Sequence, residues 1–263
     1  MKISACIITF NEEKNISAAI ESVDCADEIL IVDSESTDGT KEIAESLGAR
    51  VLTQKWLGFS KQKQMAVDYA RYDWILSLDA DEQISPELRD EISKLKLLPE
   101  NAVADGYEIA RLSFYMNRPI RHGGWYPNRQ LRLFNRNKGF WKDVLVHESV
   151  EMQKEAKIRK LDGDIFHYSI KNAAHHHNII GERYAPLAAR QMFERGILTT
   201  PFKIMTAGFT TFLQTYILKL GFLDGLAGFC IARFAAHHAF LKNLLLWEMQ
   251  CENLRSEIQR PKS

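Results

Sequence analysis

The sequence has little cysteine and no excess of charge of either sign. Its four cysteines are scattered along the chain without the CxxC spacing of a zinc or redox site (Cys6, Cys25, Cys230 and Cys251). The 34 basic and 34 acidic side chains cancel to a formal net charge of zero, so we expect no nucleic-acid partner. The first residues, MKISACIITF, lack the basic region and cleavage site of a secretory signal. We therefore expect a cytoplasmic protein in a reducing environment.

Long uncharged runs and phosphate-binding glycine motifs are also missing. The longest uncharged stretch of the apolar C-terminal part, Ile204 to Leu218, has 15 residues, whereas a membrane-spanning helix needs about 20. The first half contains neither a Walker A motif nor GxGxxG. These absences argue against a membrane-spanning protein, a P-loop protein and a dinucleotide-binding protein.

Short apolar runs alternate with helical patterns over residues 1–111. The runs ISACIIT, EILIVD, ARVLTQ and DWILSL predict strands. Asn11 is suited to cap the helix after the first strand, and Gly48 to end the next helix. A third helix is expected from about Ser60 to Ala70, and a fourth begins with Ser85 at the N-cap. This rhythm predicts an α/β fold with a mostly parallel central sheet covered by helices.

The pattern changes twice further along the chain. Residues 112–170 contain short strands such as QLRLF and GDIFHYS between aromatic, Arg-rich loops, which suits a lid or an acceptor-binding half. Residues 171–263 are helical and markedly apolar. We therefore expect one domain over residues 1–170, with halves at 1–111 and 112–170, and a helical extension over 171–263.

Polar side chains follow three of the predicted strands: Asn11, Asp33, Asp79 and Asp81. Because ligands bind beyond the carboxyl ends of the strands in an open parallel sheet, these residues should converge on one crevice. The stretch LDADE adds Glu82, and Mg²⁺ or Mn²⁺ would relieve the repulsion among its carboxylates while bridging to a substrate phosphate. The alternative is an acidic surface loop in which Glu82 is an exposed helix cap.

Four segments of the first 110 residues, in order, resemble motifs of family 2 glycosyltransferases: CIITFNEEKNISAAIESV, EILIVDSESTDGTKEIAESLGARV, WLGFSKQKQMAVDYA and WILSLDADEQISPELRDEI. Members of that family are inverting enzymes of GT-A fold that use nucleotide sugars. Three later segments resemble a narrower branch, the bacterial lipopolysaccharide core glucosyltransferases that modify an inner-core heptose: NRPIRHGGWYPNRQLRLFNR, VHESVE and GFLDGLAGF. The resemblance implies a Rossmann-like GT-A domain with a nucleotide sugar, UDP-glucose, as donor.

The resemblance also implies roles for individual residues. The nucleotide-sugar-binding set is Thr9, Phe10, Asn11, Glu13, Asp33, Lys63 and Asp79. Asp81 would bind the metal, and His167 in DIFHYS is the candidate for a further ligand. As alternatives, Phe10 would belong to the core, Asn11 would only cap a helix, and His167 would be structural.

Inverting transfer needs a carboxylate that takes a proton from the acceptor hydroxyl. Glu148 in VHESVE matches the position of the family's base, although many members have Glu-Asp where this chain has His147 and Glu148. Asp143 is the alternative base.

Arginine and aromatic side chains are interleaved between residues 117 and 136, and they suit an acceptor that carries phosphate and sugar rings. The predicted acceptor-binding residues are Arg118, Arg121, Trp125, Tyr126, Arg129 and Arg132. A solvated basic loop is the alternative. The three histidines at 175–177 point in different directions on a helix, so we interpret them as the start of a surface helix and not as a metal site.

The apolar stretch from Phe202 to Trp247 also carries Lys203, Lys219, Arg233 and Lys242. Such a segment suits the interface of an anionic membrane, with basic side chains at the headgroups. A buried helical subdomain or an oligomer interface is the alternative.

The carboxylate pattern and the family resemblance together imply a metal-dependent glycosyltransferase, and the resemblance places it at the inner face of the bacterial inner membrane with a lipopolysaccharide core acceptor. Two alternatives stay open: a transferase for another cell-surface glycan, such as a capsular or polyprenyl-linked one, and a catalytically silent nucleotide-sugar-binding scaffold.

Overall fold

The computed structural model describes residues 1–143 and 148–258 of the chain. They form two compact units. The first, here called the sheet unit, contains residues 1–113 and 127–168, and the second, the helical unit, contains residues 114–126 and those from 169 onward. Residues 114–126, expected in the acceptor half of the first domain, therefore group with the C-terminal helices.

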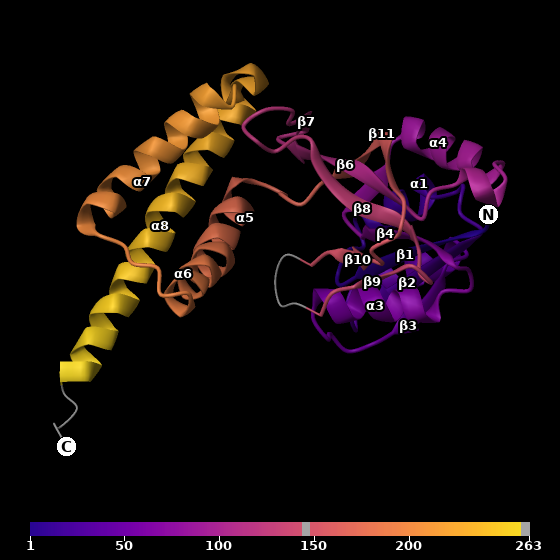
Figure 1. Cartoon of the computed structure of the whole chain (residues 1–263), viewed down its shortest axis with the longest axis horizontal. Helices are drawn as coiled ribbons and strands as arrows, with labels where there is room; N and C mark the ends of the chain where they lie inside the picture. Colours follow the sequence, from indigo (N-terminus) through magenta and orange to yellow (C-terminus); the bar gives the residue numbers. More distant parts are fainter. Residues whose placement is uncertain (144–147, 259–263) are drawn as a thin grey trace. The chain divides into compact units, whose positions relative to one another are not determined.

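The sheet unit is built on a mixed sheet with the strand order β3-β2-β1-β4-β8-β6-β11-β5 (Figure 1). The first four strands in this order are parallel, and they are the strands that the apolar runs predict. Their bounds are β1 (Ile3–Thr9), β2 (Glu28–Asp33), β3 (Arg50–Thr53) and β4 (Trp74–Asp79). Helices follow them as expected: α1 (Ile16–Ser22), α2 (Thr40–Ser46), α3 (Phe59–Tyr69) and α4 (Pro86–Lys96). The predicted α/β class is confirmed.

These helices cover both faces of the sheet. Ile3, Ala5 and Ile7 of β1 pack in one apolar core with residues of α1, α2 and α4. Cys6 and Ile8 point to the other face, where α3 completes a second core. Every residue of β1 is buried, as expected of a parallel strand covered on both sides. Burial of each of these Ile side chains stabilises the fold by roughly 1.5–3 kcal/mol.

The predicted helix ends are partly confirmed. The Ser85 hydroxyl accepts a hydrogen bond from the backbone N–H of Leu88 (3.2 Å), and Pro86 occupies the first turn of α4. Gly48 follows α2 with φ of +81°, a conformation that favours glycine. The expectation for Asn11 is wrong, because α1 begins five residues later, after Asn15.

The second half of the sheet is antiparallel where it joins β4. Strand β8 runs antiparallel to both β4 and β6, β11 is parallel to β6, and β5 is antiparallel to β11. The bounds are β5 (Glu82–Ile84), β6 (Gly106–Tyr115), β8 (Asn128–Asn135) and β11 (Ile158–His167), and a separate ribbon pairs β9 (Gly139–Trp141) with β10 (Val150–Met152). A 3₁₀ turn, η1 (Glu100–Ala102), precedes β6.

The helical unit is organised around one long helix, α8 (Gly225–Ile258), with α6 and α7 packed along it (Figure 1). The other helices are α5 (Ala173–Asn178), η2 (Ile179–Tyr184), α6 (Ala185–Glu194), α7 (Pro201–Leu213), η3 (Gln214–Leu218) and η4 (Gly221–Asp224). The strand β7 (Arg118–Pro119) pairs with the end of β6 in a hairpin of the same unit. A small apolar core joins this hairpin to α8 through Tyr115, Ile120, Ala227 and Ile231.

Across the described residues, no helix combines the length and the apolarity that crossing a bilayer requires.

Candidate active site

The carboxyl ends of β2, β1 and β4 lie side by side, as the sequence predicts. In the register of the sheet, Thr9 pairs with Asp33, and Ile8 pairs with Asp79. Because adjacent strands are about 4.8 Å apart, Asp33 and Asp79 lie roughly 10 Å from each other across β1. Residues far apart in sequence are thus gathered at one edge of the sheet.

Asp33 is buried and organises the loop after β2. Its carboxylate accepts hydrogen bonds from the hydroxyl (2.5 Å) and the backbone N–H (2.9 Å) of Ser36. The Ser36 hydroxyl accepts in turn from the backbone N–H of Asn11 (2.9 Å), and the Asn11 side chain accepts from the backbone N–H of Thr37 (2.8 Å). Asn11 adopts a left-handed conformation, with φ of +53°, and ties the ends of β1 and β2 together.

The other predicted nucleobase residues lie at the end of β1 and in the segment between β1 and α1. Phe10 leaves 55% of its surface exposed, so it is not a core residue and presents an aromatic face at the sheet edge. The Thr9 hydroxyl is buried and makes no hydrogen bond within the described part of the chain. Glu13 accepts a hydrogen bond from the backbone N–H of Gly39 (3.2 Å), which joins this loop to the start of α2.

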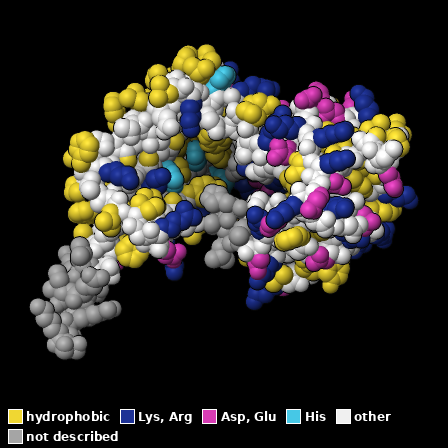
Figure 2. Space-filling view, viewed as in Figure 1, with side chains coloured by type: hydrophobic (Ala, Val, Ile, Leu, Met, Phe, Trp, Pro, Cys, Tyr) yellow, Lys and Arg dark blue, Asp and Glu magenta, His cyan; other side chains and the backbone are white. Residues whose placement is uncertain are grey.

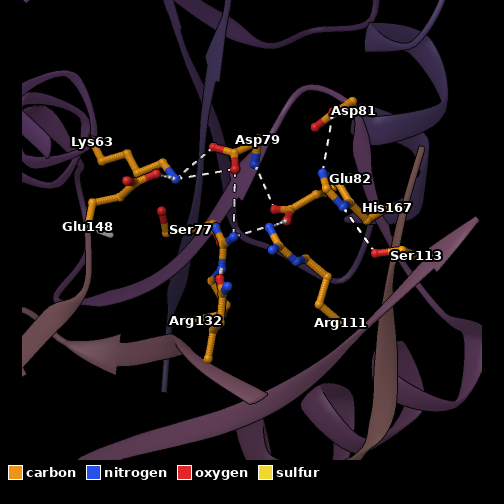
Figure 3. A network of polar contacts seen from close by, with 11 residues as sticks. Lys63, Ser77, Asp79, Asp81, Glu82, Arg111, Ser113, Arg132, Glu148 and His167 are labelled. Atoms are coloured by element: carbon orange, nitrogen blue, oxygen red, sulfur yellow. Dashed lines mark hydrogen bonds and ion pairs between the residues drawn. The ribbon is translucent and has the colours of Figure 1, made fainter. Parts of the chain in front are cut away.

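Asp79, at the end of β4, lies between two cations (Figure 3). The ammonium group of Lys63, buried on α3, is 2.9 Å from one carboxylate oxygen, and the guanidinium of Arg132 is 3.6 Å from the other. Burial would raise the pKa of the Asp79 carboxyl, but the charges of Lys63 and Arg132 outweigh it and hold that pKa well below its ordinary value. Asp79 is therefore an anion at neutral pH.

Glu82 is completely buried and is not the exposed cap considered above. One of its oxygens is 2.9 Å from the Arg132 guanidinium and 3.4 Å from that of Arg111, while the other accepts from the backbone N–H of Asp79 (3.0 Å). The guanidinium of Arg132 also donates to the backbone carbonyl of Ser77 (3.3 Å). Glu82 thus anchors the turn that carries Asp79 and Asp81.

Arg132 was expected to bind the acceptor, but the structure places it elsewhere. It is 2% exposed, and the partners described above, together with the Gln130 side chain, occupy its guanidinium. Burial lowers its pKa, yet the charges of Glu82 and Asp79 reverse the effect and raise that pKa above its usual value. The physical reason is that a buried cation needs acceptors around it. Arg132 is enclosed by Asp79, Glu82 and the Ser77 carbonyl, and it therefore holds these site residues in place.

Asp81 faces His167 at the end of β11. The carboxylate oxygen Oδ2 is 3.5 Å from Nε2 of His167, while Nδ1 of the same ring lies 3.4 Å from the Ser113 hydroxyl (Figure 3). Register explains the meeting, because His167 pairs with Glu82 on one side and with Ser113 on the other. The predicted metal ligands are therefore neighbours. Within the described ranges, no group of three His, Cys, Asp or Glu side chains is placed to hold a metal ion.

The two candidate bases differ in their surroundings. Glu148 is half-buried, and one of its oxygens is 3.6 Å from the Lys63 ammonium group, so Lys63 joins it to Asp79. Asp143 is mostly exposed and lies 3.6 Å from Lys61 on the outside of α3. His147, which precedes Glu148, lies outside the described residues.

The predicted acceptor residues are divided between the two units. Arg129 lies in the sheet unit and donates to the backbone carbonyl of Leu161 (2.9 Å). Arg118 and Arg121 are exposed on the helical unit, where Tyr126 lies under the Arg121 guanidinium and Trp125 packs against the small core.

Charge is nearly balanced around Asp79. Three carboxylates face three protein cations: Asp79, Glu82 and Glu148 against Lys63, Arg111 and Arg132. Among the four acids of this site, Asp81 is then the one whose neighbour is a histidine and not a Lys or Arg. Arg111, Ser36 and Ser113 were not among the predicted site residues. The three close carboxylates of LDADE indicate that compensating positive charge is needed, but they do not identify the arginines that supply it.

The chain is similar to known glycosyltransferases. The sequence model of glycosyl transferase family 2 matches residues 4–161, more than half of the chain. An uncharacterized glycosyltransferase of Rickettsia bellii is 34% identical over 95% of this chain and 88% of its own length. The lipopolysaccharide core biosynthesis glycosyltransferase LpsC of Rhizobium meliloti is 28% identical over 98% of this chain and 96% of its own.

Among solved structures, S. aureus TarS 1–349 in complex with UDP-GlcNAc is 16% identical, with a TM-score of 0.48 over 98% of this chain and 92% of that chain. The match to the family model and the extended similarity to the relatives agree with the strand-end arrangement described above. This chain belongs to family 2 of the glycosyltransferases.

Proposed function

We propose that the protein is a metal-dependent inverting glycosyltransferase that moves glucose from UDP-glucose to a heptose of a lipopolysaccharide inner core. The observation that carries the proposal is the single polar network in which Lys63 joins Asp79 to the candidate base Glu148, beside Asp81 and His167. The similarity to LpsC, whose name assigns it to lipopolysaccharide core biosynthesis, supports the acceptor class.

The donor half of the site is the loop network at the ends of β1 and β2. Phe10 offers an exposed ring for stacking on the uracil, and Asp33 and Asn11 hold the loop in the shape that receives the base. Asp79, kept anionic by Lys63 and Arg132, faces the ribose and the donor sugar. Lys63 itself is buried between carboxylates, so its part in donor binding is to hold Asp79 in place.

Glu148 is the base in this proposal. The acceptor hydroxyl oxygen forms a bond to the anomeric carbon while the bond from that carbon to the diphosphate oxygen breaks, and Glu148 takes the hydroxyl proton. The pairing with Lys63 keeps the carboxylate in the network that contains Asp79, whereas Asp143 lies against Lys61 on the surface. This contrast favours Glu148 over Asp143.

Asp81 and His167 fit a divalent ion. Two ligand atoms on one ion at about 2.1 Å are roughly 3–3.5 Å apart, and the observed separation of 3.5 Å falls in that range. The contact of Ser113 with Nδ1 leaves Nε2 of His167 facing Asp81, an arrangement typical of metal-binding histidines. Mg²⁺ or Mn²⁺ bound there supplies charge that stabilises the leaving diphosphate. The protein cations around Asp79 are already balanced by carboxylates, so they have no excess positive charge to offer the diphosphate.

The helical unit is proposed to lie on an anionic membrane surface, at the inner face of the inner membrane. Phe202, Met205 and Phe209 recur at helical spacing on α7, and each leaves about two thirds or more of its surface exposed. Figure 2 shows hydrophobic side chains across the visible face of this unit. Between residues 200 and 247 the charged side chains are Lys203, Lys219, Arg233 and Lys242 against Asp224 alone, which favours anionic lipid.

Two experiments test the proposal. Thermal stability should rise with UDP only when Mn²⁺ is present, and UDP-glucose should be transferred to truncated lipopolysaccharide acceptors that end in heptose. Binding without turnover on any acceptor would point to a silent scaffold, and transfer to another glycan alone would refute the acceptor.

For the membrane, phosphatidylglycerol vesicles should bind the protein more strongly than phosphatidylcholine vesicles. The variant Met205→Ser/Phe209→Ser should lose this binding while it keeps transfer to a lipid-free acceptor. If the unmodified protein binds neither type of vesicle, the membrane proposal is refuted.

A further inference from the structure

Two segments of the helical unit, separated by about 100 residues, meet at one carboxylate. Asp224, in GFLDGLAGF, is almost completely buried, and it accepts from the backbone N–H of His122 (2.8 Å) and of Arg121 (3.3 Å). Its Oδ1 also lies 2.9 Å from Nδ1 of the His122 ring. Three donors therefore converge on a single acidic side chain and fix the loop that follows β7.

This contact sets the orientation of the His122 ring. An ionised carboxylate only accepts hydrogen bonds, so Nδ1 of His122 carries the proton that points to Asp224. Nε2 is then the nitrogen left for a ligand, on a side chain that is one-third exposed. A His–Asp pair of this kind holds an imidazole in one tautomer and one rotamer.

The loop is fastened on its other side by Lys219. The backbone N–H of Gly123 donates to the carbonyl of Lys219 (2.8 Å), and Gly123 and Gly124 both have positive φ, of +68° and +84°. A Cβ on Gly124 would lie 2.9 Å from the Lys219 ammonium nitrogen, so that cation lies directly against the loop. The positive φ angles favour glycine at both positions.

Positive charge is concentrated around His122. The Arg118 guanidinium lies against Gly225, next to Asp224, and Arg121 lies over the Tyr126 ring, with 5.4 Å from its guanidinium carbon to the ring centroid. Arg118, Arg121 and Lys219 are exposed, and none has a carboxylate partner within the part of the chain that the structure describes. The charge of Asp224, by contrast, is directed at the loop donors. Three exposed cations and one partly exposed imidazole thus lie on this loop or directly against the loop and its Asp224 anchor.

We propose that this cluster, formed by Arg118, Arg121, His122 and Lys219 and positioned by Asp224, binds a phosphate monoester carried by the acceptor. Guanidinium groups match phosphate oxygens with paired hydrogen bonds, and Lys and His add charge and a further hydrogen bond. The assignment to the acceptor rests on the proposed function, whereas the phosphate site itself does not. Asp224 is a positioning residue that acts through His122 and the loop.

The first test measures phosphate binding without any transfer. In long-range ¹⁵N spectra of the histidine side chains, inorganic phosphate should shift the His122 signal, identified by its loss in His122→Gln, in a saturable manner. Glucose at the same concentration and ionic strength should leave it unchanged. Arg121→Gln should weaken the phosphate effect at least about threefold. An unchanged His122 signal would overturn the proposal.

Asp224→Asn separates positioning from simple electrostatics, because the two predict opposite signs. Removal of a negative charge by itself would tighten phosphate binding. The amide, however, has one oxygen for three donors, so the loop and the His122 ring lose their orientation and phosphate binding should weaken. Glu248→Gln removes an exposed acid of the same unit and should have no effect. Tighter binding to Asp224→Asn would refute the positioning role.

The second test assigns the phosphate to the acceptor. For a phosphorylated core acceptor, His122→Gln and Asp224→Asn should raise KM at least about tenfold with kcat within twofold, and phosphatase treatment of the acceptor should remove the difference. A fall in kcat at constant KM would overturn the binding role. If the variants lose binding to phosphatidylglycerol vesicles instead, with KM unchanged, the phosphate belongs to a lipid headgroup and the acceptor assignment fails. Absence of transfer by the unmodified protein would refute the proposed function and leave the phosphate titration standing.

Discussion

Replacing the three carboxylates of LDADE one at a time by their amides should separate stability from catalysis. Glu82→Gln removes a fully buried charge that is shared by Arg132 (2.9 Å) and Arg111 (3.4 Å). Both carboxylate oxygens of Glu82 accept hydrogen bonds, one from the arginines and the other from the Asp79 backbone N–H. The NH₂ group of the Glu82→Gln side chain would therefore face a donor in either orientation. Breaking a buried ion pair from one side costs about 3–5 kcal/mol, so the free energy of unfolding should fall by that amount.

Asp81→Asn should have the opposite profile. Asp81 is partly exposed, and its neighbour is His167 at 3.5 Å, so the loss should cost no more than about 1 kcal/mol of stability. Turnover should nevertheless fall at least about 100-fold, because Asp81 is the proposed metal ligand. Asp79→Asn should impair both properties, since it disturbs the partners of Lys63 and Arg132 and the donor contact.

The assay is urea unfolding of each variant, combined with initial rates under saturating Mn²⁺. Glu45→Gln, on the exposed side of α2, is the matched control and should change stability by less than about 0.5 kcal/mol. The double variant Glu82→Gln/Arg132→Met should cost less than the sum of the single changes, because both remove the same pair. If Glu82→Gln costs less than about 1 kcal/mol, or Asp81→Asn costs as much as Glu82→Gln, the division of roles is wrong.

Three further predictions concern single residues. Glu148→Gln should nearly abolish transfer and leave UDP affinity unchanged, whereas Asp143→Asn should keep activity; the reverse result would move the base to Asp143. Asp33→Ala should raise the donor KM more than it lowers kcat, and an unchanged donor affinity would show that the nucleobase loop lies elsewhere. Burial, and to a lesser degree the charge of His175, lower the pKa of His176 to about 4, against an ordinary value of 6.5. Between these pH values the unfolded chain binds the extra proton, so stability should fall by up to about 2 kcal/mol from pH 7 to pH 5. His176→Phe, which keeps the packing against Tyr115 and Phe234, should flatten this dependence in urea titrations; an equal slope in both proteins would refute it.

The first half of the fold was predictable because its strands are buried on both faces. A parallel strand such as β1, which is buried along its whole length, is mostly apolar, and the polar residue after it lies at the carboxyl edge of the sheet. That rule places Asp33 and Asp79 at the same edge of the sheet, whereas their separation across β1 follows from the strand order. The start of α4 and the end of α2 were predictable as well, because Ser85, Pro86 and Gly48 are strong local signals.

Burial of cations was not predictable from local pattern. Arg132 lies in the predicted strand QLRLF, but no local pattern shows that this strand inserts between β4 and β6 and carries the side chain under the carboxylates. Strand order of this kind depends on long-range pairing, which single-sequence periodicity does not record. Asn11 failed as a cap for a related reason, since its side chain bonds to Thr37 from a different βα unit.

The contact between His122 and Asp224 shows which feature of the sequence can indicate a contact between segments about 100 residues apart. Between residues 200 and 247, Asp224 is the one acidic side chain, and it lies among glycines and large apolar residues. A carboxylate in such surroundings is costly unless donors enclose it. Backbone N–H groups of a tight, glycine-rich loop are suitable donors, and the RHGG segment supplies such a loop together with an imidazole. An isolated acid in an apolar stretch therefore indicates that a partner loop must exist, while only the folded chain identifies that loop as residues 121–124.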